Sequence, residues 1–582
     1  MRPTPTFVII FQLVLCCMTI FVPICRAFRS TSLIYQREMS PPSPLRVTST
    51  FRGATNVDFE GKNIKPSVAI IGGGIAGLSC AAELQQSYDV TVYDTGRLRP
   101  GGRASSRQPR DPLKEDEHPG NFPILSKFRY DHAAQFISCS ASDTSKWREE
   151  FNKQLEKWVD QGILQIAPVD SMYALEKKGP SSWKWTCINS KSDDGSSTKS
   201  TVEFYYPPEG MSSLSQAMMK EGSFKVEQDV WVSPSSGVRF LSQQKNNDPD
   251  SQKSPSKWQV RAQGRVLGEY SHLVIAHNGK CADRLMSQTP AKDVHKLLRV
   301  NFNDRVPANG GRKMTLNSLY SVTIALKSPS PLSRALPDSF LCGFVQGHPK
   351  LSVVSCQTQK YPPMSYGNAN DETIEVWNIL STATFAKQHK APQEFLPEEV
   401  VANVTQQLVE ALEEIVVSNI DNSPLLDQVV DSRVQLWGAA VPMNVWNAKG
   451  SKSGFVWDPR FQVGVCGDWL VEPSIAGAWT SGRCIGRHLK EIRQARQNQN
   501  DQSVGLDGRF EASSGVQRLG IASLDGPMND SKENDTRLRG FNTSPGSRNR
   551  ASNKHQGESG SIRQGNRVPQ QKKGRTIDSS NG

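Results

Sequence analysis

The alternation of apolar and polar residues predicts strands and helices through the middle of the chain. The apolar run at 68–71 is short and continuous, which is typical of a parallel strand buried on both faces. The stretch 75–86 then gathers its apolar residues on one side at helical spacing, and 89–93 predicts a second strand. A strand, a helix and a strand in this order predict the beginning of an α/β fold.

The second half of the chain continues this pattern. Apolar alternation at 319–326 and 373–380 predicts two strands of a mixed sheet, and 398–417 predicts an amphipathic helix. The inward face of that helix is expected to hold Val400, Val401, Val404, Leu408 and Leu412. Beyond residue 463 an apolar strand ends in Gly-Asp, and a further helix is expected over 477–490.

The N-terminal end, residues 1–65, lacks this pattern. Residues 7–22 are apolar but too few for a comfortable transmembrane helix, and they follow a basic start, as in a signal peptide. Small residues precede Phe28, and 28–36 holds Arg and Ser but no acid, as in a transit peptide. The segment resembles the two-part presequence of algae with secondary plastids. This implies a plastid reached through the endoplasmic reticulum, with the secretory pathway as the alternative, and no stable membrane span in the mature chain.

The C-terminal end, 491–582, is rich in Ser, Gly, Asn, Gln and Arg and has no Trp or Tyr. Such a segment buries too little apolar surface to offset the entropy of ordering, so we expect a disordered basic tail. The net charge of the chain is +12, and each end contributes +5, which leaves +2 for 66–490. Because the basic surplus lies in the ends, we expect no nucleic-acid partner. The 11 cysteines form no C-x-x-C pair and no cluster with His, so no metal site is expected.

The strongest chemical signal is a G-x-G-x-x-G motif directly after the first predicted strand, formed by Gly72, Gly74 and Gly77. Gly72 permits the tight turn, Gly74 lets the backbone approach a pyrophosphate, and Gly77 lets the helix lie close to the strand. The helix begins at Ile75 and Ala76, and its N-terminus offers free N–H groups and a partial positive charge to a phosphate. The motif therefore predicts a dinucleotide site.

Asp94 lies 22 residues beyond Gly72, can accept hydrogen bonds from both ribose hydroxyls and would repel a 2′-phosphate, which argues against an NADP-type dinucleotide. The residues that follow Asp94 favour FAD over NAD. A Gly-Gly-Arg follows, in which Gly102 allows close backbone approach and Arg103 can form a fork onto phosphate. Near the end of the predicted fold, Asp468 and the following helix offer a second cradle for phosphate and ribityl groups. A cofactor that extends through the domain needs these additional groups.

Together with 131–136 and 273–276, these motifs resemble the amine-oxidase superfamily of FAD enzymes, and within it the renalase-like NAD/FAD-dependent oxidoreductases. The resemblance spans about 67–489. It implies an α/β fold in which an FAD-binding Rossmann-like domain of the glutathione-reductase type is interleaved with a smaller α+β substrate domain. The implied FAD-binding domain comprises 66–140, 205–290 and 454–490, and the implied substrate domain comprises 141–204 and 291–453.

The resemblance also implies FAD held without a covalent link, because no Cys lies where a flavin tether is expected. The cofactor contacts that it implies are Gly72, Gly74, Ile75, Ala76, Gly77, Asp94, Arg97, Gly102, Arg103, Gln135, Val230, Gly467, Asp468 and Ala478. The sequence departs from the family at Ala133, where Gly is usual, and beside Trp437, where the family often has a basic residue. The second departure leaves the substrate open.

The implied activity is that of an FAD-dependent oxidoreductase. It transfers a hydride from a small-molecule donor, an amine or a dihydronicotinamide-like compound, to flavin N5, with O2 as acceptor and hydrogen peroxide as product. The alternatives are an FAD-dependent desaturase or dehydrogenase of plastid isoprenoid or tetrapyrrole metabolism, and a non-catalytic FAD-binding protein. Hydride transfer needs positioning more than an acid–base pair, and no catalytic dyad is evident.

The aromatic residues of the second half divide into two groups. Trp437 and Trp469 are candidates to line a pocket that faces the flavin, and Trp469 directly follows Asp468. Trp377 and Trp457 are expected in the hydrophobic core, and His132 is expected to be structural.

Overall fold

The computed structural model describes residues 65–109, 111–112, 123–140, 146–177, 179, 182–189, 202–242, 256–362, 373–393, 395–416, 423–449, 453–495 and 502–513. The predicted presequence lies outside these residues except for residue 65, and so does the predicted tail beyond 513. In the part of the chain that is described, no helix combines the length and the apolar character needed to cross a membrane.

The first of two large sheets has six strands in the order β10-β2-β1-β14-β24-β23. These strands are β10 (Lys225–Glu227), β2 (Asp89–Tyr93), β1 (Ser67–Ile71), β14 (His272–Ile275), β24 (Val463–Val465) and β23 (Val456–Asp458). The strands from β10 to β24 pair in parallel, and β23 is antiparallel to β24. β1 and β14 are buried over nearly their whole length, as their continuous apolar residues predict.

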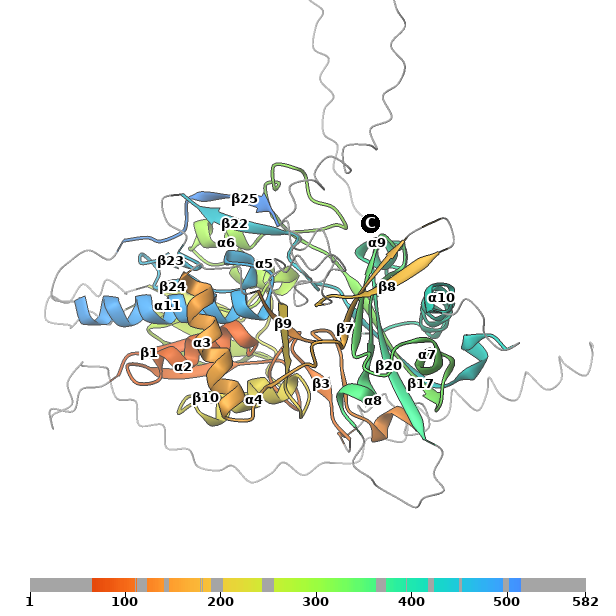
Figure 1. The fold of residues 1–582 in the computed structure, drawn as a ribbon. Helices are drawn as coiled ribbons and strands as arrows, with labels where there is room; N and C mark the ends of the chain where they lie inside the picture. The colour runs from red at the N-terminus through yellow and green to blue at the C-terminus, as the bar shows by residue number, and fades with distance from the viewer. Residues whose placement is uncertain are drawn as a thin grey trace, which may run out of the picture.

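Helices cover both faces of this sheet. On one face α2 (Ile75–Leu84) and α11 (Ile475–Ala495) lie side by side (Figure 1). They approach closely because glycine faces the partner backbone, since a Cβ at Gly482 would lie 2.1 Å from the carbonyl oxygen of Ala76. On the other face, α5 (Gly279–Ser287) and α6 (Lys292–Leu298) share a core with the sheet. A parallel sheet covered on both faces confirms the predicted α/β fold with a Rossmann-like nucleotide-binding domain.

The second large sheet has seven strands in the order β21-β17-β20-β19-β18-β7-β8. They are β21 (Val429–Trp437), β17 (Leu319–Lys327), β20 (Ile374–Ser381), β19 (Leu351–Cys356), β18 (Cys342–Gln346), β7 (Met172–Lys177) and β8 (Trp183–Cys187). All neighbours are antiparallel except β18 and β7. The amphipathic helix α10 (Glu398–Val416) packs Val404, Leu408 and Leu412 onto this sheet, as predicted.

The remaining elements connect or extend the two sheets. They are β3 (Ser106–Arg107), η1 (Leu125–Lys127), β4 (Tyr130–Asp131), β5 (Ile137–Ser140), α3 (Lys146–Asp160), β6 (Gln165–Ile166), β9 (Val202–Tyr206), α4 (Ser212–Lys220), β11 (Val238–Leu241), β12 (Lys257–Ala262), β13 (Arg265–Tyr270), β15 (Val300–Phe302), β16 (Met314–Leu316), α7 (Pro331–Ala335), α8 (Gln357–Lys360), α9 (Ala383–Gln388), η2 (Leu425–Gln428), β22 (Asn444–Ala448), η3 (Asp468–Leu470) and β25 (Gly508–Ala512). Among them β11, β12 and β13 form a meander that packs beside the first sheet.

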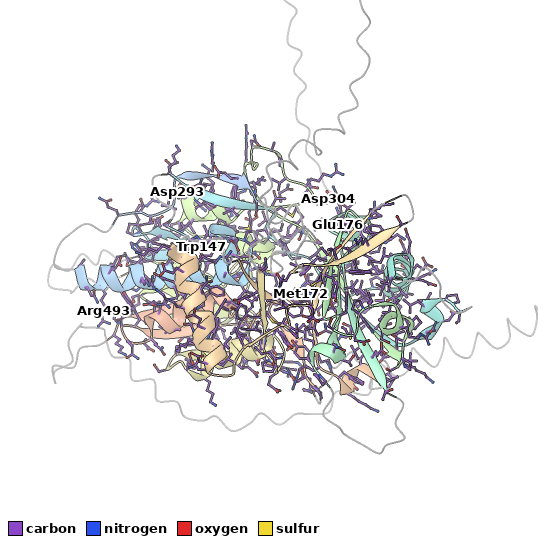
Figure 2. The ribbon with its side chains drawn as sticks, in the orientation of Figure 1. Trp147, Met172, Glu176, Asp293, Asp304 and Arg493 are labelled. Carbon is purple, nitrogen blue, oxygen red and sulfur yellow. The ribbon has the colours of Figure 1, made fainter. Side chains whose placement is uncertain are left out.

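The packing of α3 differs from the predicted domain boundaries. Residues 141–204 were expected in the substrate domain, yet Phe151 and Trp158 of α3 pack against Trp479 of α11, with ring centroids 5.4 and 6.5 Å apart. Figure 2 shows Trp147 of α3 on the side of the first sheet and Glu176 of β7 on the side of the second. The apolar face of a helix is evident in the sequence, but the element that covers it is decided by tertiary packing.

The predicted start of the disordered tail at residue 491 is wrong for the residues nearest the fold. α11 continues to Ala495, and β25 pairs antiparallel with β22. Phe510 is 2% exposed and packs in the core of the first sheet, while its neighbours in β25 are partly exposed or exposed. One inward aromatic residue and a strand edge to pair with are sufficient to order this segment despite its polar composition.

Candidate cofactor site

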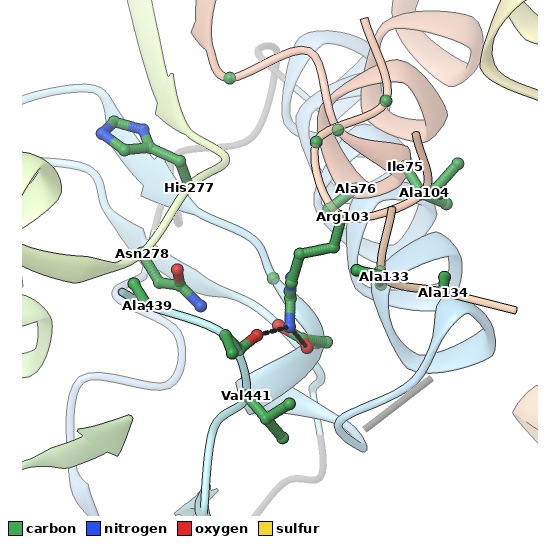
Figure 3. Close-up of a pocket in the computed structure, with 18 of the residues that line it drawn as sticks. Ile75, Ala76, Arg103, Ala104, Ala133, Ala134, His277, Asn278, Ala439 and Val441 are labelled. Atoms are coloured by element: carbon green, nitrogen blue, oxygen red, sulfur yellow. Dashed lines mark hydrogen bonds and ion pairs between the residues drawn. The ribbon is translucent and has the colours of Figure 1, made fainter. Parts of the chain in front are cut away.

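A cavity lies at the carboxyl ends of β1, β2, β14 and β24, and its far wall is formed by the ends of β17, β20 and β21 from the second sheet. Figure 3 shows residues that line the cavity, among them Ile75, Arg103 and His277. Most of the cofactor contacts implied by the resemblance line this cavity, namely Gly72, Gly74, Ile75, Ala76, Asp94, Gly102, Arg103, Gly467, Asp468 and Ala478. Both pocket candidates, Trp437 and Trp469, line it as well. The structure therefore brings together residues from the two ends of the folded region.

The glycine-rich loop after β1 forms the floor of the cavity. Gly72 has φ of +114°, a conformation that favours glycine, and its N–H donates to the carbonyl of Tyr93 at 2.8 Å. A Cβ at Gly74 would meet no atom within 4 Å, because Gly74 faces open space at the N-terminus of α2. A Cβ at Gly77 would lie 2.0 Å from the carbonyl oxygen of Gly72, so Gly77 serves the close packing of helix and loop.

Asp94 follows β2 and its carboxylate is held in a fixed orientation. Its Oδ1 accepts from the N–H of Gly73 at 3.0 Å, and its Oδ2 accepts from the N–H of Gly96 at 3.1 Å. Each carboxylate oxygen has a second lone pair, so both can still accept from a ligand hydroxyl. The geometry suits a group that receives hydrogen bonds from a ribose diol.

Arg103 reaches across the cavity toward the second cradle. Its guanidinium lies 2.8 Å from Oδ2 of Asp468 and donates to the carbonyl oxygen of Ala440 at 2.9 Å (Figure 3). Asp468 is nearly buried, with 4% of its side chain exposed, whereas 31% of the Arg103 side chain is exposed. Arg103 can therefore turn its remaining donors toward an anion in the cavity while Asp468 holds it.

Two helix N-termini face the cavity. Ile75 and Ala76 open α2, and Ile475 opens α11, with Ser474 accepting the N–H of Gly477 at 2.9 Å on its hydroxyl. The first N–H groups of each helix have no partner within the helix, and the helix dipole places partial positive charge there. These are two separate positions at which phosphate oxygens can bind.

Trp469 contributes an unsatisfied donor. The side chain is fully buried, and among the described residues its Nε1–H has no hydrogen-bond partner. A buried N–H without an acceptor is costly, and Trp469 lines the cavity. The Nε1 atom is itself closed off from the cavity, so Trp469 lines the cavity with its ring and does not offer this donor to a ligand.

Sequence reasoning recognised the motif 273–276 but named none of the residues that follow β14 as cofactor contacts. Ala276, His277 and Asn278 line the cavity beside the glycine-rich loop. The Nδ1 of His277 donates to the carbonyl of Ile71 at 3.0 Å, because a carbonyl oxygen can only accept. Burial lowers the pKa of His277, although that hydrogen bond and Asp94 oppose the shift. These residues could have been found from their place in the chain, because they follow a predicted parallel strand. The carboxyl end of a parallel strand that lies next to the G-x-G-x-x-G strand borders the ligand.

The wall on the side of the second sheet is mostly apolar. Leu319, Leu380 and Val441 line it, together with Trp437, whose Nε1 donates to the carbonyl of His132 at 3.2 Å. Gln393 is its polar member, and its Oε1 accepts from the N–H of Gly438 at 3.0 Å. Trp377 and Trp457 lie in the hydrophobic cores, as predicted. Apart from Trp437, these wall residues were not identified from the sequence, because they come from strands far apart along the chain.

Four of the implied cofactor contacts do not line the cavity. Gly77 packs behind the loop, and Arg97 is directed toward the carbonyl of Pro112 at 3.4 Å. The N–H of Val230 donates to the carbonyl of Asp94 at 2.9 Å, beside the cavity. Gln135 is fully buried behind the wall, where its Oε1 accepts from Ser355 at 2.9 Å. The contacts assigned to these residues remain predictions.

Comparison with known proteins supports the nucleotide-binding unit. Residues 70–153 match the family model of an NAD(P)-binding Rossmann-like domain. Among solved structures, the chain is similar to a putrescine oxidase bound to putrescine, with 12% identity, a TM-score of 0.43, and 74% of this chain and 99% of that chain covered. It is also similar to a flavoprotein/dehydrogenase from Cytophaga hutchinsonii, with 11% identity, a TM-score of 0.36, and 75% and 80% covered. At this level of similarity, the activities of these two proteins do not transfer to the chain.

Proposed function

We propose that this chain is an FAD-dependent oxidoreductase that takes a hydride from a small-molecule donor. The observation that carries the proposal is the extent of one cavity. It begins at the glycine-rich loop and Asp94, passes the pair formed by Arg103 and Asp468, and ends against the apolar wall of the second sheet. NAD and FAD both carry a pyrophosphate, but FAD continues from it into a ribityl chain and a large ring system, which the pair of Arg103 and Asp468 and the apolar wall can place.

Each part of the cavity has a task in this proposal. Asp94 binds the ribose diol, and the N-termini of α2 and α11 bind phosphate oxygens. Arg103 donates to phosphate, and Asp468 accepts from a sugar hydroxyl. Binding in this site is non-covalent.

The apolar wall is where the donor binds. When bound, FAD supplies a hydride acceptor at N5 and can pass the electrons to O2, giving hydrogen peroxide. The chain positions the donor and excludes water with Leu319, Leu380 and Trp437. Among the described residues of this wall none is ionisable, which supports a reaction that needs no protein acid or base. The donors proposed are a neutral amine or a dihydronicotinamide.

A second candidate within the same enzyme class is an FAD-dependent desaturase or dehydrogenase that acts on an apolar plastid isoprenoid or tetrapyrrole. The apolar wall favours it, since an amine oxidase acting on a cationic substrate would gain from a carboxylate near the donor. Such an enzyme passes its electrons to an acceptor other than O2. The two candidates therefore differ in whether donor oxidation in air yields hydrogen peroxide.

The test uses the purified full-length protein incubated with FAD. We expect a yellow protein whose flavin is released by acid denaturation, and whose visible band bleaches anaerobically with a primary amine or with NADH. Peroxide on admitting air supports an oxidase, and bleaching without peroxide supports the dehydrogenase. The variant Asp94→Asn is expected to bind FAD about tenfold more weakly, since each buried hydrogen bond contributes about 1 kcal/mol. A protein that binds no FAD overturns the proposal. A yellow protein that is bleached neither by these donors nor by an apolar isoprenoid or tetrapyrrole indicates a non-catalytic FAD-binding protein.

Delivery to a plastid is proposed from the composition of 1–65 alone. Fusing these residues to a fluorescent protein in an alga with secondary plastids is expected to give plastid fluorescence. A fusion ending at Ala27, which lacks the transit-like stretch, is expected to stop in the secretory pathway. Secretion of the longer fusion would favour the alternative destination.

A further inference from the structure

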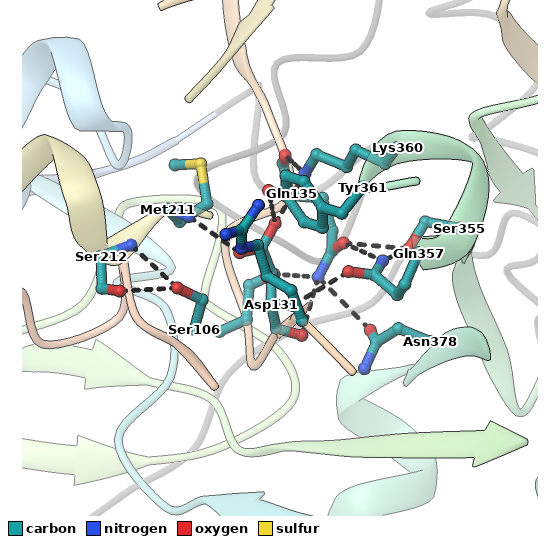
Figure 4. Close-up of polar contacts among 12 residues, drawn as sticks. Ser106, Asp131, Gln135, Met211, Ser212, Ser355, Gln357, Lys360, Tyr361 and Asn378 are labelled. Atoms are coloured by element: carbon teal, nitrogen blue, oxygen red, sulfur yellow. Dashed lines mark hydrogen bonds and ion pairs between the residues drawn. The ribbon is translucent and has the colours of Figure 1, made fainter. Parts of the chain in front are cut away.

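A fully buried lysine lies behind the cavity wall. Lys360 is the last residue of α8, and its side chain has no exposed surface. Its Nζ lies 2.6 Å from Oδ2 of Asp131 and also donates to the carbonyl oxygen of Gln135 (Figure 4). The ring of Phe136 lies 4.2 Å from Nζ, and that of Tyr361 lies 5.0 Å away. The ammonium is thus enclosed by one carboxylate, one carbonyl and aromatic faces.

Asp131 is equally well satisfied. Its Oδ1 accepts from the N–H of Met211 at 2.9 Å, and its Oδ2 accepts from the hydroxyl of Tyr361 at 2.6 Å. Its own N–H donates to Oε1 of Gln357 at 2.9 Å. Burial lowers the pKa of Lys360 and Asp131 raises it, so the carboxylate is the group that favours the charged amine. These partners come from two parts of the chain, since Met211 precedes α4 whereas Gln357, Lys360 and Tyr361 belong to α8 and the residue after it.

The chain between Asp131 and Gln135, the two residues that Lys360 contacts, forms part of the cavity wall. Ala133 and Ala134 line the cavity, and the N–H of Ala134 donates to the carbonyl of Arg103 at 3.2 Å. On one side, Trp437 holds the carbonyl of His132 at 3.2 Å. On the other side, Lys360 holds the carbonyl of Gln135. The wall is therefore fixed from both ends by donors of the second sheet and its helix α8.

Stability alone does not account for this arrangement. Removing two charges from water costs free energy that their attraction often fails to recover, and apolar replacements of buried ion pairs are frequently as stable. A buried pair does, however, fix geometry, because its hydrogen bonds are directional and leave few alternative packings. The geometry fixed here is that of 131–136, which borders the cavity.

We propose that Lys360 is a positioning residue of the cofactor cavity, holding Asp131 and Gln135 so that Ala133 and Ala134 present a small, fixed wall to the flavin ring. Lys360 does not touch the cavity and acts through the backbone that it holds. The inference rests on the proposed function for the identity of the ligand. The positioning of the wall itself can be measured without a cofactor.

The principal test compares the double variant Lys360→Met/Asp131→Asn with the wild type. The double variant removes both buried charges, and the amide oxygen that replaces the carboxylate would still accept from the N–H of Met211. We expect a folded apoprotein whose midpoint of thermal unfolding is close to that of the wild type. Hydrogen–deuterium exchange in peptides covering 131–136 should be about tenfold faster, because a buried hydrogen bond to a charged group is lost. FAD binding, followed by quenching of flavin fluorescence, should weaken about tenfold, with a changed visible band.

Two further variants make the test specific. Lys387→Met removes a partly exposed lysine on α9 that pairs with Asp304 at 2.7 Å, and it should change neither exchange at 131–136 nor FAD binding. Lys360→Gln/Asp131→Asn also removes both buried charges but keeps an N–H donor at 360, so it should shift both readouts in the same direction by a smaller factor. It also serves where Lys360→Met/Asp131→Asn does not fold.

The outcomes separate this proposal from the proposed function. Unchanged exchange at 131–136 in a folded variant overturns the positioning role. Faster exchange with FAD binding and spectrum like those of the wild type also overturns it, since the wall would then not matter to the ligand. Faster exchange in a protein whose wild type binds no FAD overturns the proposed function and supports only the holding of the wall by Lys360.

Discussion

The guanidinium of Arg103 and the carboxylate of Asp468 lie 2.8 Å apart and join the two ends of the folded chain at one point of the cavity. The carbonyl of Ala440 accepts from the same guanidinium nitrogen at 2.9 Å. Arg103 is therefore held in place by protein groups, with part of its surface open to the cavity. A side chain that is already oriented loses little entropy when it binds an anion.

This arrangement predicts the effect of changing Arg103. Arg103→Met is expected to weaken FAD binding about 10- to 100-fold, because hydrogen bonds to charged groups contribute about 1.5–3 kcal/mol. Arg103→Lys should recover only part of this loss, since an ammonium cannot form the planar fork. Fluorescence titration of FAD at low and high ionic strength measures both effects, and binding by Arg103→Met should depend less on salt.

Arg97 provides the matched control for Arg103. The resemblance to FAD enzymes predicts that both residues contact the cofactor, but Arg97 does not line the cavity. Arg97→Met should therefore leave FAD affinity within about twofold of the wild type. Equal losses for Arg97→Met and Arg103→Met would contradict the site described above.

Two glycines of one motif are expected to respond differently to alanine. Gly74→Ala places a methyl group in open space, so the free energy of unfolding should fall by less than about 1 kcal/mol. The same methyl group occupies the approach of the pyrophosphate, so FAD affinity should fall at least about tenfold. Gly77→Ala places its methyl 2.0 Å from the carbonyl oxygen of Gly72 and should lower stability by about 1–3 kcal/mol or more.

Urea unfolding and FAD titration of both variants test this difference. Loss of FAD binding without loss of stability is expected only for Gly74→Ala. If Gly74→Ala bound FAD as tightly as the wild type, the glycine-rich loop would not be the pyrophosphate site.

His277 is expected to make stability depend on pH. Burial lowers its pKa in the folded protein below the value of about 6.5 found in unfolded chains. Between these two values the unfolded state binds more protons, so the free energy of unfolding should decrease as pH falls below about 6.5. His277→Gln should lessen this decrease, as measured by urea unfolding at pH values from neutral to mildly acidic. Identical pH profiles for the two proteins would contradict a depressed pKa at His277.

The sequence predicts the parts of the site that follow local chain order. β1, the glycine-rich loop, α2 and Asp94 are contiguous, and each has a signature in residue type and spacing. The wall residues Leu319 and Leu380 have no such signature, because apolar residues at strand ends are common and only sheet packing brings these two to the cavity. The motif containing Gln135 was evident, but its amide turns toward Ser355 and Gln357, which lie in another sheet and its helix.

The sequence did not predict β25, the last strand of the fold, because it lies within a segment of polar composition. This strand leads to a further prediction. Phe510 of β25 packs against Trp446, with ring centroids 5.0 Å apart, and against the cavity residue Trp469 at 6.1 Å. A chain ending at residue 501 lacks this contact and should lose about 3–5 kcal/mol in the free energy of unfolding, as Phe510→Ala should. Both should also bind FAD more weakly, because Trp469 loses the ring that supports it. A chain ending at residue 513 keeps β25 and is the control, expected to match the full chain in urea unfolding and FAD titration. Equal stability of the two shortened chains would show that β25 contributes nothing to the fold.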